Sequence, residues 1–568
     1  MKYNKTALRL CLGGRRAATQ LVRTAKFLGV TDLRTLLDSF VEWHLDAHPV
    51  RATLLGATGR EDTLGDQTAA AWTRRDAETR EWLDRFAAVD ASGLSLDDSV
   101  DRDLVLATLR GEAILADEPD WRRDPGLYVG PILSGLFTLF LHRLRPEPEL
   151  VASAVARLRE VPGVLAAAKA NLDASISPAL IVKRALGQTR SARAFLTTAL
   201  PGEVADESLR RTLAEAAGPA ADAFDEFATW LAEFAERANG DWRMGERKYS
   251  ALLRERELLG YGATELHERG ELVYAELDAQ MRELATKVPG GSPDWHAVMT
   301  ALQNDHPPTL EAMRAEYAAE TERARRFLID NDLVPFAEGE QCRVVPSPGF
   351  QRPILSVAFY IAPPPLTSSR LGHFFVPFTP EDFTEEQVRQ RLATNSRAQM
   401  PTIAVHEAYP GHHWHLSWMA GSDRTVRKLF RTPYFSEGWA LYAERLLSEN
   451  GYFADPAHEL AHLEARIFRA ARIVVDTALH CGEMSIEEAE KHMATKASLT
   501  PGTAVGEVNR YCAWPTQAPS YLTGSLEIEK IREDYLAAGR GDVRSFNATI
   551  AGSGALPLGL ARRVALES

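Results

Sequence analysis

Cysteine is scarce in this sequence, and the few cysteines are scattered along it. Only four of the 568 residues are cysteines, and no two of them stand in a CxxC spacing. This distribution argues against a metal site built from thiolates and against a disulfide framework. The four are Cys11, Cys342, Cys481 and Cys512.

The sequence also lacks a long apolar run. The longest one, residues 126–141, has sixteen residues and is interrupted by Gly130, Pro131 and Gly135. A helix needs about 20 apolar residues to span a membrane. We therefore expect this run to form a buried helix or the wall of a hydrophobic cleft.

An excess of positive charge is missing as well. Lysine and arginine total 65 residues against 78 aspartates and glutamates, which gives a net charge of −13. Broad binding to nucleic acid or to an anionic membrane needs a basic surface, so we expect neither partner.

The N-terminus differs from the rest of the chain in charge. The first thirty residues carry seven lysines or arginines and no acid. Arg9, Arg15 and Arg16 break up the apolar residues, so the continuous apolar region of a secretory signal is absent. We predict a basic arm over residues 1–34 and a cytoplasmic protein.

The full chain is 45% hydrophobic and 25% charged, as in globular proteins. Apolar residues recur at three- and four-residue spacing in 150–172, 203–238 and 262–287, which predicts long amphipathic helices. We expect a helical N-terminal part over residues 35–335 and a catalytic part over 336–568, joined in one unit with a cleft.

A small sheet is expected near the boundary between these parts. Residues 343–365 and 371–378 are rich in Pro, Val, Phe and Tyr, which is typical of short strands and turns. Thr384 and Gln387 have the spacing of a capping box and predict the start of a helix. The fold class is therefore mainly α with a small β-sheet.

The most unusual segment of the chain is VHEAYPGHHWHLS, in which four histidines lie within ten residues. His406-Glu407 matches the first half of the zincin motif HExxH, where two histidines on one helix face hold zinc and the glutamate acts as general base. The position of the second histidine is taken by Pro410. The four histidines are His406, His412, His413 and His415.

Metal binding therefore requires a distorted helix. On a straight helix His406 and His413 are separated by about 10 Å of rise, too far for one ion. Pro410 interrupts the hydrogen-bond ladder and Gly411 allows unusual dihedral angles. A break there brings back either His412 or His413 as the second ligand.

A third ligand is found in the segment FSEGWALYAERL. Its Glu437 resembles the glutamate on the second helix that completes the zinc site of thermolysin-like aminopeptidases. Two histidines, one glutamate and an open position form a catalytic zinc site, although manganese or cobalt also accepts such donors.

A complete HExxH match also occurs at residues 458–462, HELAH. On a helical wheel Leu460, Leu463 and Ile467 share one face and both histidines lie on the opposite side, which predicts a solvated polar face. The C-terminal part of that side is flanked by strongly apolar sequence, so we expect it to line a polar cleft. It carries Arg469, Arg472, Asp476 and His480.

Several blocks resemble the bacterial domain-of-unknown-function 885 family, which is regarded as metallopeptidase-like. The blocks are HEAYPGHHWH, EGWALYAERL, RAARIVVDTALH and RYCAWPTQAPSYLTGSLEI, in that order, with WHLDAHPVRATLLG and RLGHFFVPF upstream. The resemblance covers roughly residues 40–560. It implies a zincin-like fold with a cleft, and a hydrolase acting on peptides or peptide-like amides. It also favours His412 over His413 as second ligand.

The expected mechanism uses zinc held by His406, His412 and Glu437. Glu407 takes the proton of the attacking water and delivers it to the leaving amine. Three residues are candidates for stabilising the oxyanion. They are Tyr521, Arg510 and His480.

Two features bear on the substrate. Gly372 to Val376, including Phe374, is predicted to form an edge strand that pairs with an extended peptide. Arg472 or Arg469 could bind a substrate carboxylate, which favours carboxypeptidase or dipeptidase action on small peptides. A helix pair between Arg472 and Asp476 is the structural alternative.

Two other functions remain open at this point. One is hydrolysis of an amide or ester in a small biosynthetic metabolite, because the zinc chemistry is the same. The other is a metal-binding scaffold without catalysis, against which the intact Glu407 argues.

Overall fold

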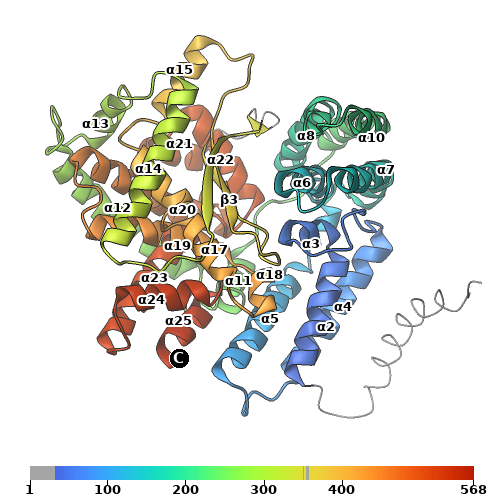
Figure 1. The fold of residues 1–568 in the computed structure, drawn as a ribbon, viewed down its shortest axis with the longest axis horizontal. Coiled ribbons are helices and arrows are strands. Elements are labelled where there is room, and N and C mark those ends of the chain that lie inside the picture. The colour runs from blue at the N-terminus through green and yellow to red at the C-terminus, as the bar shows by residue number, and fades with distance from the viewer. Residues whose placement is uncertain (1–31, 349–350, 353–356) are drawn as a thin grey trace, which may run out of the picture.

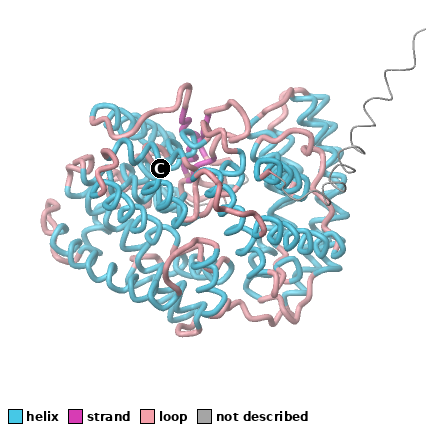
Figure 2. The backbone as a smooth tube through the Cα atoms, turned by 90° about the horizontal axis from the view of Figure 1, so that it is seen from below, coloured by secondary structure: helices cyan, strands magenta, loops and turns pink. Residues whose placement is uncertain are grey.

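The structure is a computed structural model that describes residues 32–348, 351–352 and 357–568. Helices make up 67% of it, and the strands form one small sheet. Figure 2 shows the strands gathered at one place among the helices. The predicted fold class, mainly α with a small sheet, is confirmed. The predicted basic arm falls on residues 1–34, of which 1–31 lie outside the described residues, so the arm and the cytoplasmic location stay predictions.

The N-terminal helices divide between two hydrophobic cores. The first four contribute to a large core that also contains residues from the C-terminal helices. They are α2 (Leu33–Ala47), α3 (Pro49–Leu55), α4 (Ala69–Ala87) and α5 (Leu96–Leu115). The next helices surround a core of their own and lie beside the rest of the molecule (Figure 1). They are α6 (Gly126–His142), α7 (Glu147–Asn171), α8 (Ala179–Ala194), α9 (Leu200–Gly202) and α10 (Glu207–Ala235), with a short 3-10 helix at Asp120–Arg122 and a short π-helix at Phe195–Ala199.

The apolar run at 126–141 forms α6, and its side chains contribute to this second core. Within the described residues, no single helix is both long and apolar enough to cross a membrane. One bent pair, Leu96–Arg122 with Gly126–His142 at 90°, meets the criterion by length and composition only.

The three long helices predicted from periodicity are confirmed as α7, α10 and α12 (Ala263–Ala285). Helix α12 packs against the long helix α20 (Pro456–Cys481), which passes behind the candidate site. The other helices of this region are α11 (Glu246–Glu255), α13 (Trp295–Leu302) and α14 (Leu310–Asp330).

The sheet has three strands in the order β1-β3-β2. Strand β3 (Leu371–Val376) pairs in parallel with β1 (Gln341–Pro346) and antiparallel with β2 (Phe359–Ile361). The prediction that Gly372 to Val376 is an edge strand for a peptide is wrong, because β3 has a neighbour on both sides. Phe374 is fully buried, and its ring lies 5.4 Å from that of Tyr317.

The C-terminal part is helical from residue 385 onward. The capping box of Thr384 and Gln387 is present at the start of α15 (Glu385–Ala393), as predicted. The helices that follow are α16 (Met400–Glu407), α17 (His412–Met419), α18 (Thr425–Leu429), α19 (Pro433–Glu449), α20, α21 (Ile486–Lys496), α22 (Pro501–Ala513), α23 (Ser520–Ala537), α24 (Val543–Gly552) and α25 (Leu558–Glu567).

Helices α19 and α23 approach closely where each carries a glycine. A Cβ atom on Gly524 would lie 1.9 Å from the carbonyl oxygen of Tyr434, and one on Gly438 would lie 2.5 Å from the Cα of Gly524. The backbones therefore touch without intervening side chains. This contact brings Glu437 on α19 close to Tyr521 on α23.

Replacing Gly524 by alanine should therefore be strongly destabilising. The added methyl group overlaps backbone atoms, so the helices must separate, and we expect a loss of about 3 kcal/mol in the free energy of unfolding. Denaturant unfolding measures it. Gly506→Ala on α22 is the matched control, because nothing lies within 4 Å of its Cβ position, and it should not destabilise. Equal unfolding midpoints for the two variants would contradict the expectation.

Candidate metal centre

The Pro-Gly pair interrupts the histidine-bearing helix, as predicted. Helix α16 ends at Glu407 and α17 begins at His412, and the intervening peptide bond Tyr409–Pro410 is cis. The backbone N–H of Gly411 donates to the carbonyl oxygen of Val405 at 3.0 Å. A Cβ atom on Gly411 would lie 2.0 Å from the carbonyl oxygen of His406, so only glycine fits this return of the chain.

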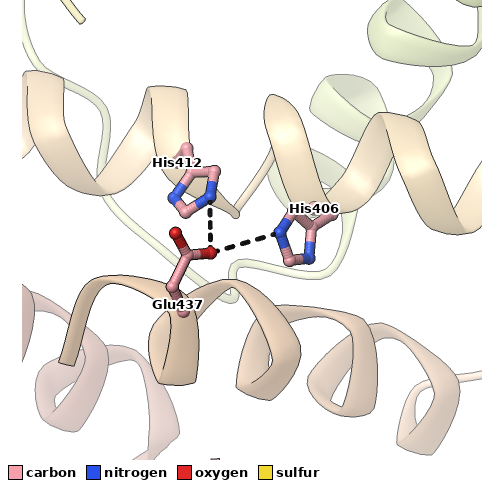
Figure 3. A group of neighbouring side chains, drawn as sticks. All are labelled: His406, His412 and Glu437. Carbon is pink, nitrogen blue, oxygen red and sulfur yellow. Dashed lines mark ion pairs between the residues drawn. The ribbon is translucent and has the colours of Figure 1, made fainter. Parts of the chain in front are cut away.

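The break places three side chains around one point (Figure 3). The Nε2 atoms of His406 and His412 lie 3.7 Å and 3.3 Å from the same oxygen, Oε2 of Glu437. The potential ligand atoms of the three residues all lie within 4.8 Å of one another, and no other such group is found in the described part of the chain. A tetrahedral zinc site requires ligand atoms about 3.3 Å apart. The three residues therefore fit a metal ion.

A fourth side chain orients the first of these histidines. Nδ1–H of His406 donates to Oε1 of Glu444 at 2.7 Å, which leaves Nε2 free to face Glu437. Histidine ligands of metals commonly donate their second ring nitrogen to a carboxylate in this way, which sets the tautomer. Glu444 is fully buried and lies seven residues, about two helical turns, after Glu437 on the same face of α19. The spacing of the two glutamates was visible in the sequence, but the role of Glu444 was not.

The HELAH segment is more buried than its predicted solvated polar face would be. His462 is completely buried, and its Nδ1 lies 3.4 Å from Oε2 of Glu444. The prediction of a solvated polar face is therefore wrong for this histidine, although His458 and Glu459 are partly exposed. The reason is that α20 packs on both sides, which a helical wheel of one helix does not reveal. His462 thus supports the carboxylate that supports His406.

These contacts shift the ionisation of the whole group. Burial by itself disfavours the charged form of each residue, but the histidines lower the pKa of Glu444 to about 2 and that of Glu437 further. In turn, Glu437 and Glu444 raise the pKa of His406 to about 10 against the effect of burial. At neutral pH the imidazole of His406 is therefore protonated, and its positive charge lies between the carboxylates of Glu437 and Glu444, where a metal cation would bind.

Glu444→Gln tests the orienting contact. Glutamine keeps the size of the side chain but removes the negative charge that His406 donates to, and we expect the dissociation constant for zinc to rise about 10- to 100-fold. Competition with a chelator measures it. Glu459→Gln is the control, because among the described residues its carboxylate accepts hydrogen bonds from the Ser448 hydroxyl alone. An unchanged constant in Glu444→Gln would contradict the assigned role.

Glu407, the predicted general base, interacts electrostatically with His406, His412 and Glu437. Glu407 follows His406 at the end of α16, is 9% exposed, and has no hydrogen-bond or ion-pair partner among the described residues. Burial raises its pKa, the two histidines oppose this, and Glu437 adds to it. An unpaired carboxylate with a raised pKa beside a metal site is suited to proton transfer.

The alternative second ligand, His413, points to a different set of partners. The hydroxyl of Tyr360 donates to its Nδ1 at 2.8 Å, and its Nε2 donates to Oε2 of Glu340 at 2.7 Å. The ring is fully buried and is not among the three grouped residues. Sequence reasoning missed Glu340, since an isolated glutamate before a strand carries no signal.

The three candidates for stabilising an oxyanion lie at different distances from this group. The ring of Tyr521 stacks 6.4 Å from that of His406, and its hydroxyl accepts a hydrogen bond from the Gln517 amide at 3.5 Å. Arg510 donates to the side-chain oxygen of the same Gln517. His480 lies elsewhere: it is eighteen residues beyond His462 on α20, about 27 Å along the helix. Its ring nitrogens contact backbone groups of Met244 and Tyr511.

The proposed carboxylate-binding residue Arg472 lies beside Tyr521, with its Cζ 4.9 Å from the phenol ring. It donates to Glu507 at 2.7 Å and to the hydroxyl of Tyr511 at 3.1 Å. The pair with Asp476 that was the structural alternative does not form, because Asp476 accepts from Tyr249.

Comparison with known proteins identifies the family of this chain. The model of a family described as "Bacterial protein of unknown function (DUF885)" matches residues 49–564. The chain belongs to this family. A search of curated proteins gave no match.

Two solved structures share the fold of this DUF885 member. One is described as a "putative lipoprotein of unknown function" from Shewanella oneidensis, with a TM-score of 0.75 and 21% identity over 94% of this chain and 99% of that one. The other is a "putative lipoprotein" from Colwellia psychrerythraea, with a TM-score of 0.80 and 18% identity over 95% and 99%. The likeness at this identity concerns the fold.

Proposed function

We propose that this protein is a zinc-dependent hydrolase that cleaves amide bonds in peptides or peptide-like small molecules. The observation that carries the proposal is the convergence of His406, His412 and Glu437 with an unpaired Glu407 beside them. A scaffold that only bound metal would have no use for this buried, unpartnered carboxylate, which costs folding free energy.

The chain's own groups supply the steps around the metal. His406, His412 and Glu437 would hold a divalent ion such as zinc, which would supply a Lewis acid and lower the pKa of a bound water to about 7. Glu407 takes the proton of the attacking water and delivers it to the nitrogen of the leaving amine.

The phenol O–H of Tyr521 donates a hydrogen bond to the oxygen of the scissile carbonyl. Burial, together with the negative charge of Glu437, raises the pKa of Tyr521, so the phenol stays protonated and able to donate. Arg510 has a supporting part, since it holds the Gln517 side chain that contacts the Tyr521 hydroxyl.

The test is a panel of short peptides with free and blocked termini, incubated with the zinc-loaded protein and with the chelator-treated protein. Cleavage that depends on zinc supports the proposal. If no peptide is cleaved while the metal is bound, the peptidase reading fails and hydrolysis of a non-peptide amide or ester takes its place. If the protein binds no metal even when zinc is supplied, the scaffold function replaces both.

A further inference from the structure

The phenol ring of Tyr521 is close both to the candidate metal centre and to two arginines of α20. The ring of His406 is 6.4 Å away. The guanidinium carbons of Arg472 and Arg469 lie 4.9 Å and 5.6 Å from the same phenol ring. The two arginines are three residues apart on one face of the helix, so both approach the ring together.

Both arginines have hydrogen-bond donors that nothing in the described part of the chain accepts. Nη1 of Arg472 and Nε of Arg469 are buried and without a partner. The Arg472 side chain is only 8% exposed, and the one bond of Arg469 is to a carbonyl oxygen of its own helix, that of Ala465. Buried donors are nearly always satisfied in native proteins, so unsatisfied ones beside an active site indicate a position for a ligand.

The two arginines differ in their ion pairs. Arg472 shares the carboxylate of Glu507 with Arg510. Arg469 forms no ion pair within the described residues, and Glu444 and Glu507 act on it only from a distance. Arginine stays protonated in proteins. A bound carboxylate would therefore give Arg469 the direct partner that it lacks.

We propose that Arg469 and Arg472 bind the free C-terminal carboxylate of the substrate, so that the hydrolase acts only at that end of a peptide. The proposal rests on the proposed function, since it assigns the substrate class of the same site. A planar carboxylate with two acceptor oxygens matches the fork of N–H groups that a guanidinium presents.

The distance between Arg472 and His406 limits the length of the C-terminal product. The two contacts of Tyr521 put the Arg472 guanidinium at most about 11 Å from the His406 ring, which is the reach of about three extended residues. Part of this span is taken by the contact between carboxylate and guanidinium. The product from the C-terminal side is therefore a single amino acid or a dipeptide.

The experiment compares peptides that are identical except for a free or an amidated C-terminus. For the zinc-loaded protein we expect kcat/KM to be about 10- to 100-fold higher for the free acid, in line with charge-assisted hydrogen bonds. Arg469→Gln should lose most of this preference by slowing cleavage of the acid and leaving that of the amide unchanged. Arg466→Lys is the matched control, because this third arginine of α20 pairs with Glu529 and should leave both rates unaltered.

A binding measurement separates this proposal from the proposed function. Calorimetry with the metal-free protein should detect N-acetyl amino acids but not their amides, and Arg469→Gln should abolish that binding. Zinc-dependent cleavage with equal rates for acids and amides would overturn the carboxylate site and leave the hydrolase standing. Arg469-dependent binding without any cleavage would keep the carboxylate site and reject the hydrolase. Inorganic phosphate that binds as tightly as the carboxylates would also overturn the assignment.

Discussion

Purified protein supplied with zinc is expected to hold about one zinc ion per chain, and His406→Ala, His412→Ala and Glu437→Ala are each expected to lose it. Each substitution removes one of the three proposed ligands, whose potential donor atoms lie within 4.8 Å of one another. Structural zinc sites share a binding free energy of about 10–16 kcal/mol among their ligands, so losing one should weaken binding more than about 100-fold. Elemental analysis and chelator competition measure the loss.

Two other histidines provide controls for this result. His413→Gln keeps a hydrogen-bonding side chain between Tyr360 and Glu340 and should retain the metal. His458→Ala alters the partly exposed histidine of the HELAH segment and should retain it too. Loss of zinc in His413→Gln but not in His412→Ala would move the second ligand by one residue. Loss only in His458→Ala would move the whole site to α20.

The same experiment has a pH dependence of known sign. The pKa of His406 is raised to about 10 in the metal-free protein, so below that pH the imidazole carries a proton that zinc must displace. Zinc binding should therefore release a proton at pH 7, and the affinity should increase as the pH rises. Calorimetry in buffers with different ionisation enthalpies reports the number of protons released.

Glu407→Gln is expected to keep the zinc and to lose turnover. The amide has nearly the same shape but cannot take a proton, and general bases contribute about 10²- to 10⁴-fold to rates. The measurement is kcat on the best substrate of the peptide panel, with zinc content determined on the same samples. A loss of metal along with activity would instead indicate that Glu407 has a structural part in the site.

Glu459→Gln is the matched control for this prediction, because Glu459 follows a histidine in the other HExxH-like match. Its carboxylate accepts from the Ser448 hydroxyl and is partly exposed, so we expect unchanged kcat. Wild-type turnover in Glu407→Gln would show that the base is another residue. Reduced turnover in Glu459→Gln alone would assign the role of general base to the HELAH segment.

The features that were predicted correctly depend on residues close together in sequence. The long helices follow from a repeat of three to four residues, and the capping box from the spacing of Thr384 and Gln387. The interruption at Pro410 and Gly411 follows from the backbone chemistry of these two residues, and it splits α16 from α17 at the predicted position.

The predictions that were wrong concern contacts between distant segments. Strand β3 was recognised as a strand, but its place between β1 and β2 depends on which segments pair with it. His462 was assigned to a solvated face because a helical wheel of one helix assumes that its polar side faces solvent. Other helices pack around α20, so His462 is buried. The contact of His462 with Glu444 joins residues on two helices.

The sequence by itself determined the main helices, the family, and the candidate residues His406 and Glu437. Spacing left His412 and His413 as alternatives for the third residue, and the family resemblance favoured His412. Only the tertiary structure decided that Glu444 orients His406 and that Glu340 and Tyr360 contact His413. It also decided that Arg469 and Arg472 lie beside Tyr521, each with a buried donor that has no partner among the described residues. The physical reason is that these contacts arise from the packing of α19, α20 and α23, where Gly438 and Gly524 let two backbones touch. No spacing along the chain records how closely two helices approach.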